Sequence, residues 1–239
     1  MNNNVDGRVA KWDNIKFVLM CFVVLGHFIN YTDFQSNLLR WLWVSIYSFH
    51  MPAFLFLSGL LSKRTITEQR LEKVFAYLYL YFTMEIFQFI VFSIVNGTPS
   101  SFVFFSDAGA PWYALVLFWC YVATGCLKSL KSNYVFIFAV VLGILAGYSN
   151  LGDFLSGMRF FTLFPFFLAG YYIPTEKLLT VVENRCVKVC SIVFLLVVFF
   201  LCYMYRDQLF GVADFLKCRT TYNNTGMLSY GGLFRTCYY

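Results

Sequence analysis

The sequence predicts an all-α integral membrane protein, a polytopic bundle of seven full transmembrane helices and part of an eighth. The first observation is composition: 60% of the 239 residues are hydrophobic and 13% are charged, whereas soluble domains average roughly 45–50% and 25%. The second is that the apolar residues gather in runs close to the roughly 20 residues that a spanning helix needs. The third is that no run alternates apolar and polar residues, so every span is expected to be helical. This composition excludes a disordered chain and an ordinary soluble enzyme.

Seven apolar runs have the length and composition of membrane spans. They cover residues 14–32, 41–61, 74–95, 112–127, 133–149, 159–174 and 187–205. An eighth run begins near Met227 and reaches Tyr239, which is too short to cross a bilayer. No soluble module or internal repeat stands out. Residues 1–239 are therefore expected to form a single membrane domain that is incomplete at its C-terminal end.

The basic residues are distributed unevenly between the two sides of these spans. Twelve lie on the side of the N-terminus and five on the opposite side, and the loop 96–111 contains no Lys or Arg. Because cytoplasmic loops are enriched in basic residues, we expect the N-terminus to lie in the cytoplasm. We expect the spans themselves to lie in the plasma (inner) membrane of the cell. The scatter of these charges over the span ends argues against nucleic-acid binding. The eight Cys lie mostly inside apolar runs without metal-ligand spacing, so no metal site is expected.

His27 and Lys16 share one face of the first predicted helix. They are eleven residues apart, which is about three turns and roughly 16 Å along the axis. Lys16 is expected at the cytoplasmic end, where Asp13 lies one turn away as an ion-pair partner. His27 is expected in the outer half of the membrane, where an ionisable group is costly and therefore a functional candidate. A hydrogen-bonded structural histidine is the alternative.

Two further ionisable side chains lie at membrane depth, His50 in the second span and Glu85 in the third. Pro52 follows His50 closely and cannot donate a helix hydrogen bond, which predicts a local kink. A structural role stays open for both residues, because a buried polar group needs only a partner. Arg159 opens the sixth span and Trp112 the fourth, so both are expected near the outer face. Trp112 suits either the interfacial aromatic belt or a wall that stacks against a sugar.

Four segments, taken in chain order, resemble the membrane acyltransferase family 3, and most closely its fucose 4-O-acetylase-like branch. They are Lys16 with His27, Phe49-His50-Met51-Pro52 followed by Phe56-Leu57-Ser58-Gly59, Trp112-Tyr113-Ala114-Leu115, and Arg159 with Pro165-Phe166-Phe167-Leu168-Ala169-Gly170. None of the four is specific alone, whereas their order and spacing together are. The resemblance extends over essentially the whole chain. Family members have more spans than this chain shows.

The resemblance implies an O-acyltransferase that moves an acetyl or similar acyl group from cytoplasmic acyl-CoA to a carbohydrate hydroxyl of a cell-surface or envelope glycan. Acetyl-CoA is then a donor substrate, and no cofactor is permanently bound. The expected partners are acyl-CoA, a carbohydrate acceptor and the lipid bilayer. The family's functional residues carry over to Lys16, His27, His50 and Arg159.

Chemistry assigns a role to these residues if the resemblance holds. His27 takes the proton of the acceptor hydroxyl, Arg159 offsets the charge of the tetrahedral intermediate, and Lys16 binds the CoA phosphates. His50 completes the catalytic set, and the substrate-binding set also includes Asp13, Glu85 and Trp112. A route through an acylated His27 is equally compatible. Two other classes stay open, a polytopic transporter or carrier built on the same buried groups and a noncatalytic remnant of an acyltransferase.

Overall fold

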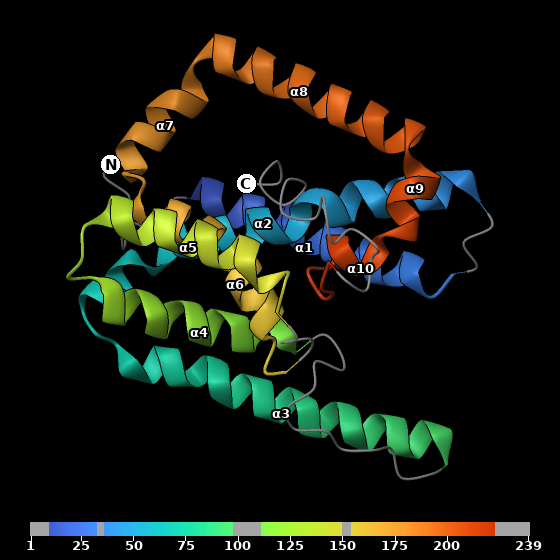
Figure 1. The fold of residues 1–239 in the computed structure, drawn as a ribbon, viewed down its shortest axis with the longest axis horizontal. Coiled ribbons are helices and arrows are strands. Elements are labelled where there is room, and N and C mark those ends of the chain that lie inside the picture. Colours follow the sequence, from blue (N-terminus) through green and yellow to red (C-terminus); the bar gives the residue numbers. More distant parts are fainter. Residues whose placement is uncertain (1–9, 33–35, 98–110, 150–153, 223–239) are drawn as a thin grey trace, which may run out of the picture.

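The computed structural model describes residues 10–32, 36–97, 111–149 and 154–222. Within these ranges every secondary-structure element longer than a single residue is a helix (Figure 1). The helices are α1 (Ala10–Asn30), α2 (Asn37–Thr67), α3 (Leu71–Asn96), α4 (Trp112–Leu127), α5 (Ser132–Ala146), α6 (Gly157–Tyr172), α7 (Thr175–Glu183), α8 (Arg185–Met204), α9 (Arg206–Gly211) and α10 (Ala213–Leu216). The all-α class predicted from the sequence is confirmed for this part of the chain.

Each of the seven predicted spans coincides with one helix, from α1 to α6 and then α8. Four of them, α1, α2, α3 and α8, are long and apolar enough to cross a membrane, and α4 and α5 are shorter apolar helices. The chain is therefore a multi-pass membrane protein, while the full count of seven spans and the cytoplasmic N-terminus stay predictions. The sequence did not predict α7, α9 and α10, because pieces this short fall below the length of a span. The run that begins near Met227 lies outside the described residues.

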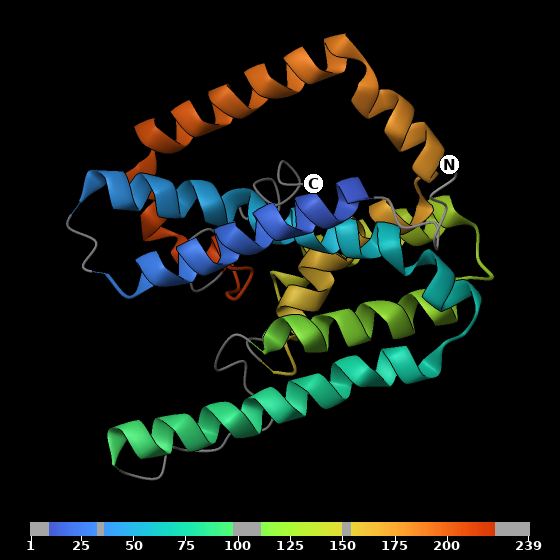
Figure 2. The same ribbon diagram turned by 180° about the vertical axis from the view of Figure 1, so that it is seen from behind.

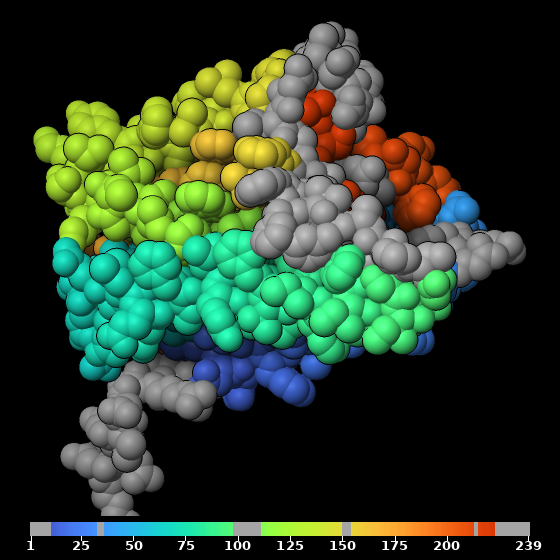
Figure 3. Space-filling view, turned by 90° about the horizontal axis from the view of Figure 1, so that it is seen from below, coloured from blue at the N-terminus to red at the C-terminus, as the bar shows by residue number. Residues whose placement is uncertain are grey.

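Helix α2 forms the centre of the bundle and packs against α1, α4, α6 and α8. In Figures 1 and 2, α3 runs along one edge beside α4, and α8 lies at the opposite edge. Figure 3 looks onto α3, which spreads across that face of the molecule. The edge helices expose large apolar side chains, such as Phe87 and Ile94 on α3 and Phe194 and Leu196 on α8. Such surfaces match the hydrocarbon of a bilayer.

Helices α2 and α6 cross at close range through a reciprocal pair of glycines. A Cβ atom at Gly59 would collide with the backbone carbonyl of Phe167, and a Cβ atom at Gly170 would collide with the carbonyl of Phe56. Small residues let membrane helices approach until their backbones touch. Both glycines belong to segments that carry the family resemblance, and the crossing gives a structural reason for them. It also holds Arg159, on α6, against the centre of the bundle.

Candidate active site

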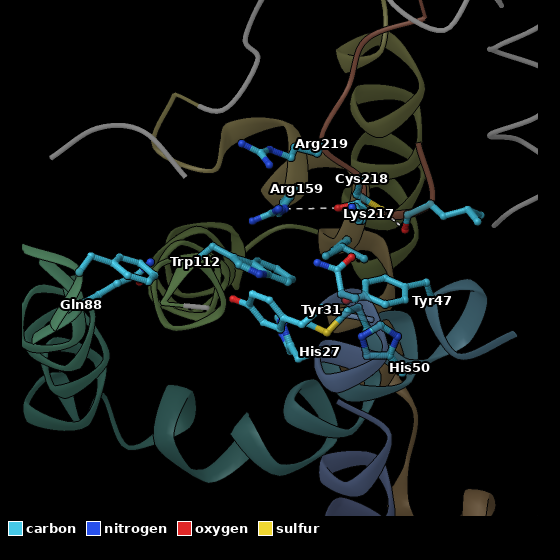
Figure 4. A pocket seen from close by; sticks show the side chains of 15 residues that line it. His27, Tyr31, Tyr47, His50, Gln88, Trp112, Arg159, Lys217, Cys218 and Arg219 are labelled. Carbon is cyan, nitrogen blue, oxygen red and sulfur yellow. Dashed lines mark hydrogen bonds between the residues drawn. The ribbon is translucent and has the colours of Figure 1, made fainter. Parts of the chain in front are cut away.

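A cavity of about 400 Å³ lies between α1, α2, α3, α4, α6 and the segment that follows α10. Its polar and aromatic lining residues include His27, Asn30, Tyr31, Tyr47, His50, Gln88, Trp112, Arg159, Lys217 and Arg219. In Figure 4, His27, Tyr31, Tyr47, Trp112 and Arg159 lie around one shared space. The lining combines imidazoles, hydroxyls, amides and cations, which suits a polar molecule and the positioning of its reacting groups.

Four of the seven residues predicted for the site line this cavity, namely His27, His50, Trp112 and Arg159. They come from four different helices, α1, α2, α4 and α6. Their separation in sequence gave no measure of their separation in space, so the packing of the bundle alone brings them together. Their chemical roles stay predictions.

The other three predicted residues do not line the cavity. Asp13 and Lys16 lie near the start of α1, about three helical turns before His27. Glu85 is buried in α3, three residues before Gln88, which does line the cavity. The roles proposed for these three in binding the donor or acceptor also stay predictions.

An apolar recess of about 240 Å³ extends the cavity along α1. The cavity and the recess share the lining residues His27, Met51 and Trp112. On α1 the recess is lined by Met20, Val23 and His27, a spacing that repeats every three to four residues and so defines one helix face. Lys16 continues this face one turn further, four residues before Met20. The recess therefore points from His27 toward Lys16.

The buried His50 has a defined arrangement of its two ring nitrogens. Its Nδ1 lies 2.7 Å from the carbonyl oxygen of Ile46, one turn earlier on α2. A carbonyl only accepts hydrogen bonds, so Nδ1 must donate, and in the neutral ring Nε2 is then the acceptor. The ring also packs against Tyr47 in a T-shaped arrangement, with ring centroids 4.9 Å apart. Helix α2 continues through Pro52 despite the missing donor.

The guanidinium of Arg159 lies over the ring of Trp112, with Cζ 4.3 Å from the ring centroid. Its Nε donates a hydrogen bond to the carbonyl of Lys217 at 3.3 Å. Arg159 is 6% exposed, so the cation and the indole face hold each other in a largely desolvated place, where such pairs are strongest. Trp112 thus supports a cation of the cavity, a contact that the sequence did not indicate.

Besides Asn30, Tyr31, Tyr47 and Gln88, sequence reasoning missed two basic lining residues, Lys217 and Arg219. They stand in a polar segment after α10, and the sequence identified them only as basic residues of a loop. Helical periodicity cannot place such a segment, because it lies in no span. In the structure it folds back over α6 and completes the cavity.

Tyr222 anchors this segment to the end of α5. Its backbone N–H donates to the carbonyl of Gly147 at 2.8 Å, and its hydroxyl donates to the carbonyl of Ile144 at 2.9 Å. A Cβ atom at Gly147 would collide with the tyrosine ring, so glycine is needed there. Between the two cations, Cys218 has a φ of 54°. Left-handed backbone at a residue other than glycine is costly and is concentrated at functional sites.

Several basic residues at the opposite end of α2 are engaged within the chain. Lys63 Nζ donates to the carbonyl of Ile173, which ends α6. Arg64 Nε lies 2.9 Å from Glu68 Oε1, and Arg70 pairs with the same carboxylate. The hydrogen bond from Arg64 and the pairing with Arg70 hold the pKa of Glu68 below its usual value. Arg64 and Arg70 thus pair within the turn between α2 and α3, whereas Lys63 contacts the junction of α6 and α7.

Among the described residues, no three His, Cys, Asp or Glu side chains come together as they would to hold a metal ion. The imidazoles and cations of the cavity are components that group transfer can use.

The chain is similar in sequence to known proteins. A family model described as an acyltransferase domain matches residues 9–238, nearly the whole chain. Over 64 residues the chain is 38% identical to the nodulation protein NolL of Mesorhizobium japonicum. This match covers 26% of the chain and 17% of that protein, so the chain matches less than a fifth of the length of this curated relative. No solved structure matches the chain.

Proposed function

The chain belongs to the membrane acyltransferase family 3, and from that membership we propose that it transfers an acetyl or similar acyl group from acyl-CoA to a carbohydrate hydroxyl. The observation that carries the proposal is the convergence of His27, His50 and Arg159 on one cavity whose apolar recess points toward Lys16. The acceptor belongs to a cell-surface or envelope glycan, and the chain lies in the plasma (inner) membrane. The fucose 4-O-acetylase-like branch is part of this proposal.

The reaction exchanges a thioester for an oxygen ester. The acceptor hydroxyl oxygen attacks the thioester carbonyl while His27 takes the hydroxyl proton, the usual role of an imidazole in general base catalysis. Arg159 offsets the negative charge on the carbonyl oxygen of the tetrahedral intermediate. The carbon–sulfur bond then breaks, and the CoA sulfur leaves with the proton that His27 returns. No metal or further cofactor enters this balance.

The recess supplies a path for the donor. Acyl-CoA carries its thioester at the end of a long, flexible arm and its phosphates at the other end. We place the arm along Met20 and Val23, with the phosphates at Lys16, roughly 16 Å along α1 from His27. Asp13 lies one turn from Lys16 and orients its ammonium group.

Lys16→Ala tests the donor site without knowledge of the acceptor. We expect acetyl-CoA binding to the detergent-solubilised chain to weaken about 10- to 100-fold, because a charge-assisted hydrogen bond to phosphate is lost. Isothermal titration measures it. The matched control is Lys11→Ala, which removes the same charge near the same helix end but from a face about 140° away. Equal losses of affinity in both variants would show that Lys16 acts only through its charge near the helix end. No acetyl-CoA binding by the unaltered chain would contradict the proposal.

His50→Asn tests the second imidazole. The asparagine amide keeps a donor near the position of Nδ1 for the carbonyl of Ile46 and lacks the acceptor at Nε2. If Nε2 accepts a hydrogen bond from the hydroxyl of the carbohydrate substrate, acyl transfer falls about tenfold or more while thermal stability changes little. Transfer is followed with radiolabelled acetyl-CoA in membranes that contain the chain. A variant that keeps full transfer would leave His50 with a structural role only.

A further inference from the structure

We infer that Tyr113 restricts the donor to short acyl groups, such as acetyl, because its side chain closes one side of the apolar recess. The inference rests on the proposed function and narrows the chemical class of its donor from acyl-CoA in general to acyl-CoA with a short chain. Tyr113 acts here as a specificity-determining residue and takes no part in the proton transfer.

Two apolar hollows meet at Tyr113. One is the recess of about 240 Å³ that extends from His27 toward Lys16. The other has a volume of about 440 Å³ and lies between α3 and α4, and it is called the α3–α4 groove below. Among the described residues that line the recess and the groove, Tyr113 is the one that both share. Its side chain therefore forms the partition between them.

The α3–α4 groove suits a hydrocarbon chain. Its lining on α3 follows the spacing of one helix face, with Leu80, Met84, Phe87 and Val91. None of the described lining residues is charged, and Gln88 supplies the one amide side chain among them. Each methylene group that moves from water into such a place contributes about fourfold in affinity. Access to the groove would therefore favour donors with longer acyl chains.

The ring of Tyr113 is fixed from several directions. Tyr113 lies in the first turn of α4, and its hydroxyl shares a hydrogen bond of 2.8 Å with the hydroxyl of Ser58 on α2. The ring also packs in T-shaped contacts against Phe54 and Trp112, with centroids 5.4 and 6.0 Å apart. Edge-to-face contacts and a bonded hydroxyl both restrict the orientation of an aromatic ring. The partition is therefore rigid.

This rigid partition limits where an acyl chain can extend. The proposed donor path places the thioester at His27, which borders both the recess and the central cavity. A longer chain that extended into the central cavity would occupy the place of the acceptor, beside the buried Arg159. A longer chain that extended toward the α3–α4 groove would meet the ring of Tyr113. An acetyl group adds one methyl group beyond the carbonyl and avoids both conflicts.

Titration of three acyl-CoA probes into the detergent-solubilised full chain tests the inference. The probes are acetyl-CoA, butanoyl-CoA and hexanoyl-CoA, and isothermal titration gives their affinities. We expect the unaltered chain to bind acetyl-CoA about tenfold or more tightly than hexanoyl-CoA, since overpacking a closed apolar site is costly. Tyr113→Ala joins the recess to the α3–α4 groove. In this variant the preference for acetyl-CoA is expected to fall about tenfold or more.

Tyr113→Phe is the matched control. It keeps the ring and lacks the hydroxyl that bonds to Ser58, so the preference for acetyl-CoA should remain. Tyr113→Leu, which retains more of the packing, replaces Tyr113→Ala if that variant does not fold. Equal binding of acetyl-CoA and hexanoyl-CoA by the unaltered chain would overturn the inference. A preference that survives in both the alanine and the leucine variant would do the same.

A double variant tests whether the α3–α4 groove is the space that receives the longer chain. Met84 is 45% exposed on α3, so a larger side chain can be accommodated there. Tyr113→Ala combined with Met84→Trp refills the groove from the side of α3 and should restore the preference for acetyl-CoA. A preference that did not return would overturn the role of Tyr113 as the partition between recess and groove.

The same titrations separate this inference from the proposed function. A chain that binds acetyl-CoA and shows no preference for acyl length would overturn the inference while it preserves the acyltransferase. A chain that binds none of the three probes would contradict the proposed function, and the inference would fall with it.

Discussion

A His27→Ala variant is expected to lose acyl transfer by about 10²- to 10⁴-fold, the usual contribution of a positioned general base. His27 lines both the central cavity and the apolar recess, so it lies where the paths of acceptor and donor meet. The alanine keeps the helix and removes only the imidazole, so membrane insertion should be unaffected. Transfer is measured with radiolabelled acetyl-CoA in membranes, at equal amounts of inserted protein.

Phe28→Ala provides the control for this loss. Phe28 is the next residue on α1, and its side chain is 71% exposed on the outer surface of the helix. This variant removes a larger side chain at the same depth without changing the cavity, so it should transfer at close to the unaltered rate. Full activity in His27→Ala would remove His27 from the reaction. Equal losses in both variants would indicate a general disturbance of α1.

Gly59→Ala is expected to destabilise the bundle by about 1–3 kcal/mol, the usual cost of overpacking a well-packed interior. The added methyl would meet the backbone carbonyl of Phe167, which cannot move without shifting α6. Gly170→Ala should act in the same way, because its methyl would meet the carbonyl of Phe56 on α2. Thermal unfolding in detergent gives the change in stability. Both variants should also lose acyl transfer, since α6 carries Arg159 into the cavity.

Gly125→Ala is a control of the same type. Gly125 lies within α4, and a Cβ atom built there meets nothing within 4 Å. Alanine favours a helix over glycine by about 0.5–1 kcal/mol, so this variant should be as stable as the unaltered chain or slightly more so. If Gly59→Ala matched Gly125→Ala in stability, the close crossing of α2 and α6 would be wrong.

The segments that carry the family resemblance show what local sequence patterns can predict and what they cannot. Gly59 and Gly170 belonged to the resemblance, and the crossing of α2 and α6 explains their presence through backbone contact. His50 was visible as an ionisable residue at membrane depth, but its ring orientation depends on the carbonyl of Ile46. Arg159 was expected near the outer face of its span, and the sequence did not indicate that its side chain is buried over Trp112.

The sequence alone determined the membrane class, and it predicted the positions of seven helices and four of the residues that line the cavity. It did so because apolar runs of span length and costly buried ionisable groups are local features that need no partner to be recognised. Only the tertiary structure decided which of these residues share one cavity. It also placed Lys217 and Arg219 there, through a segment anchored by Tyr222 on α5. Contacts between distant segments depend on how helices pack, and no periodicity along the chain records them.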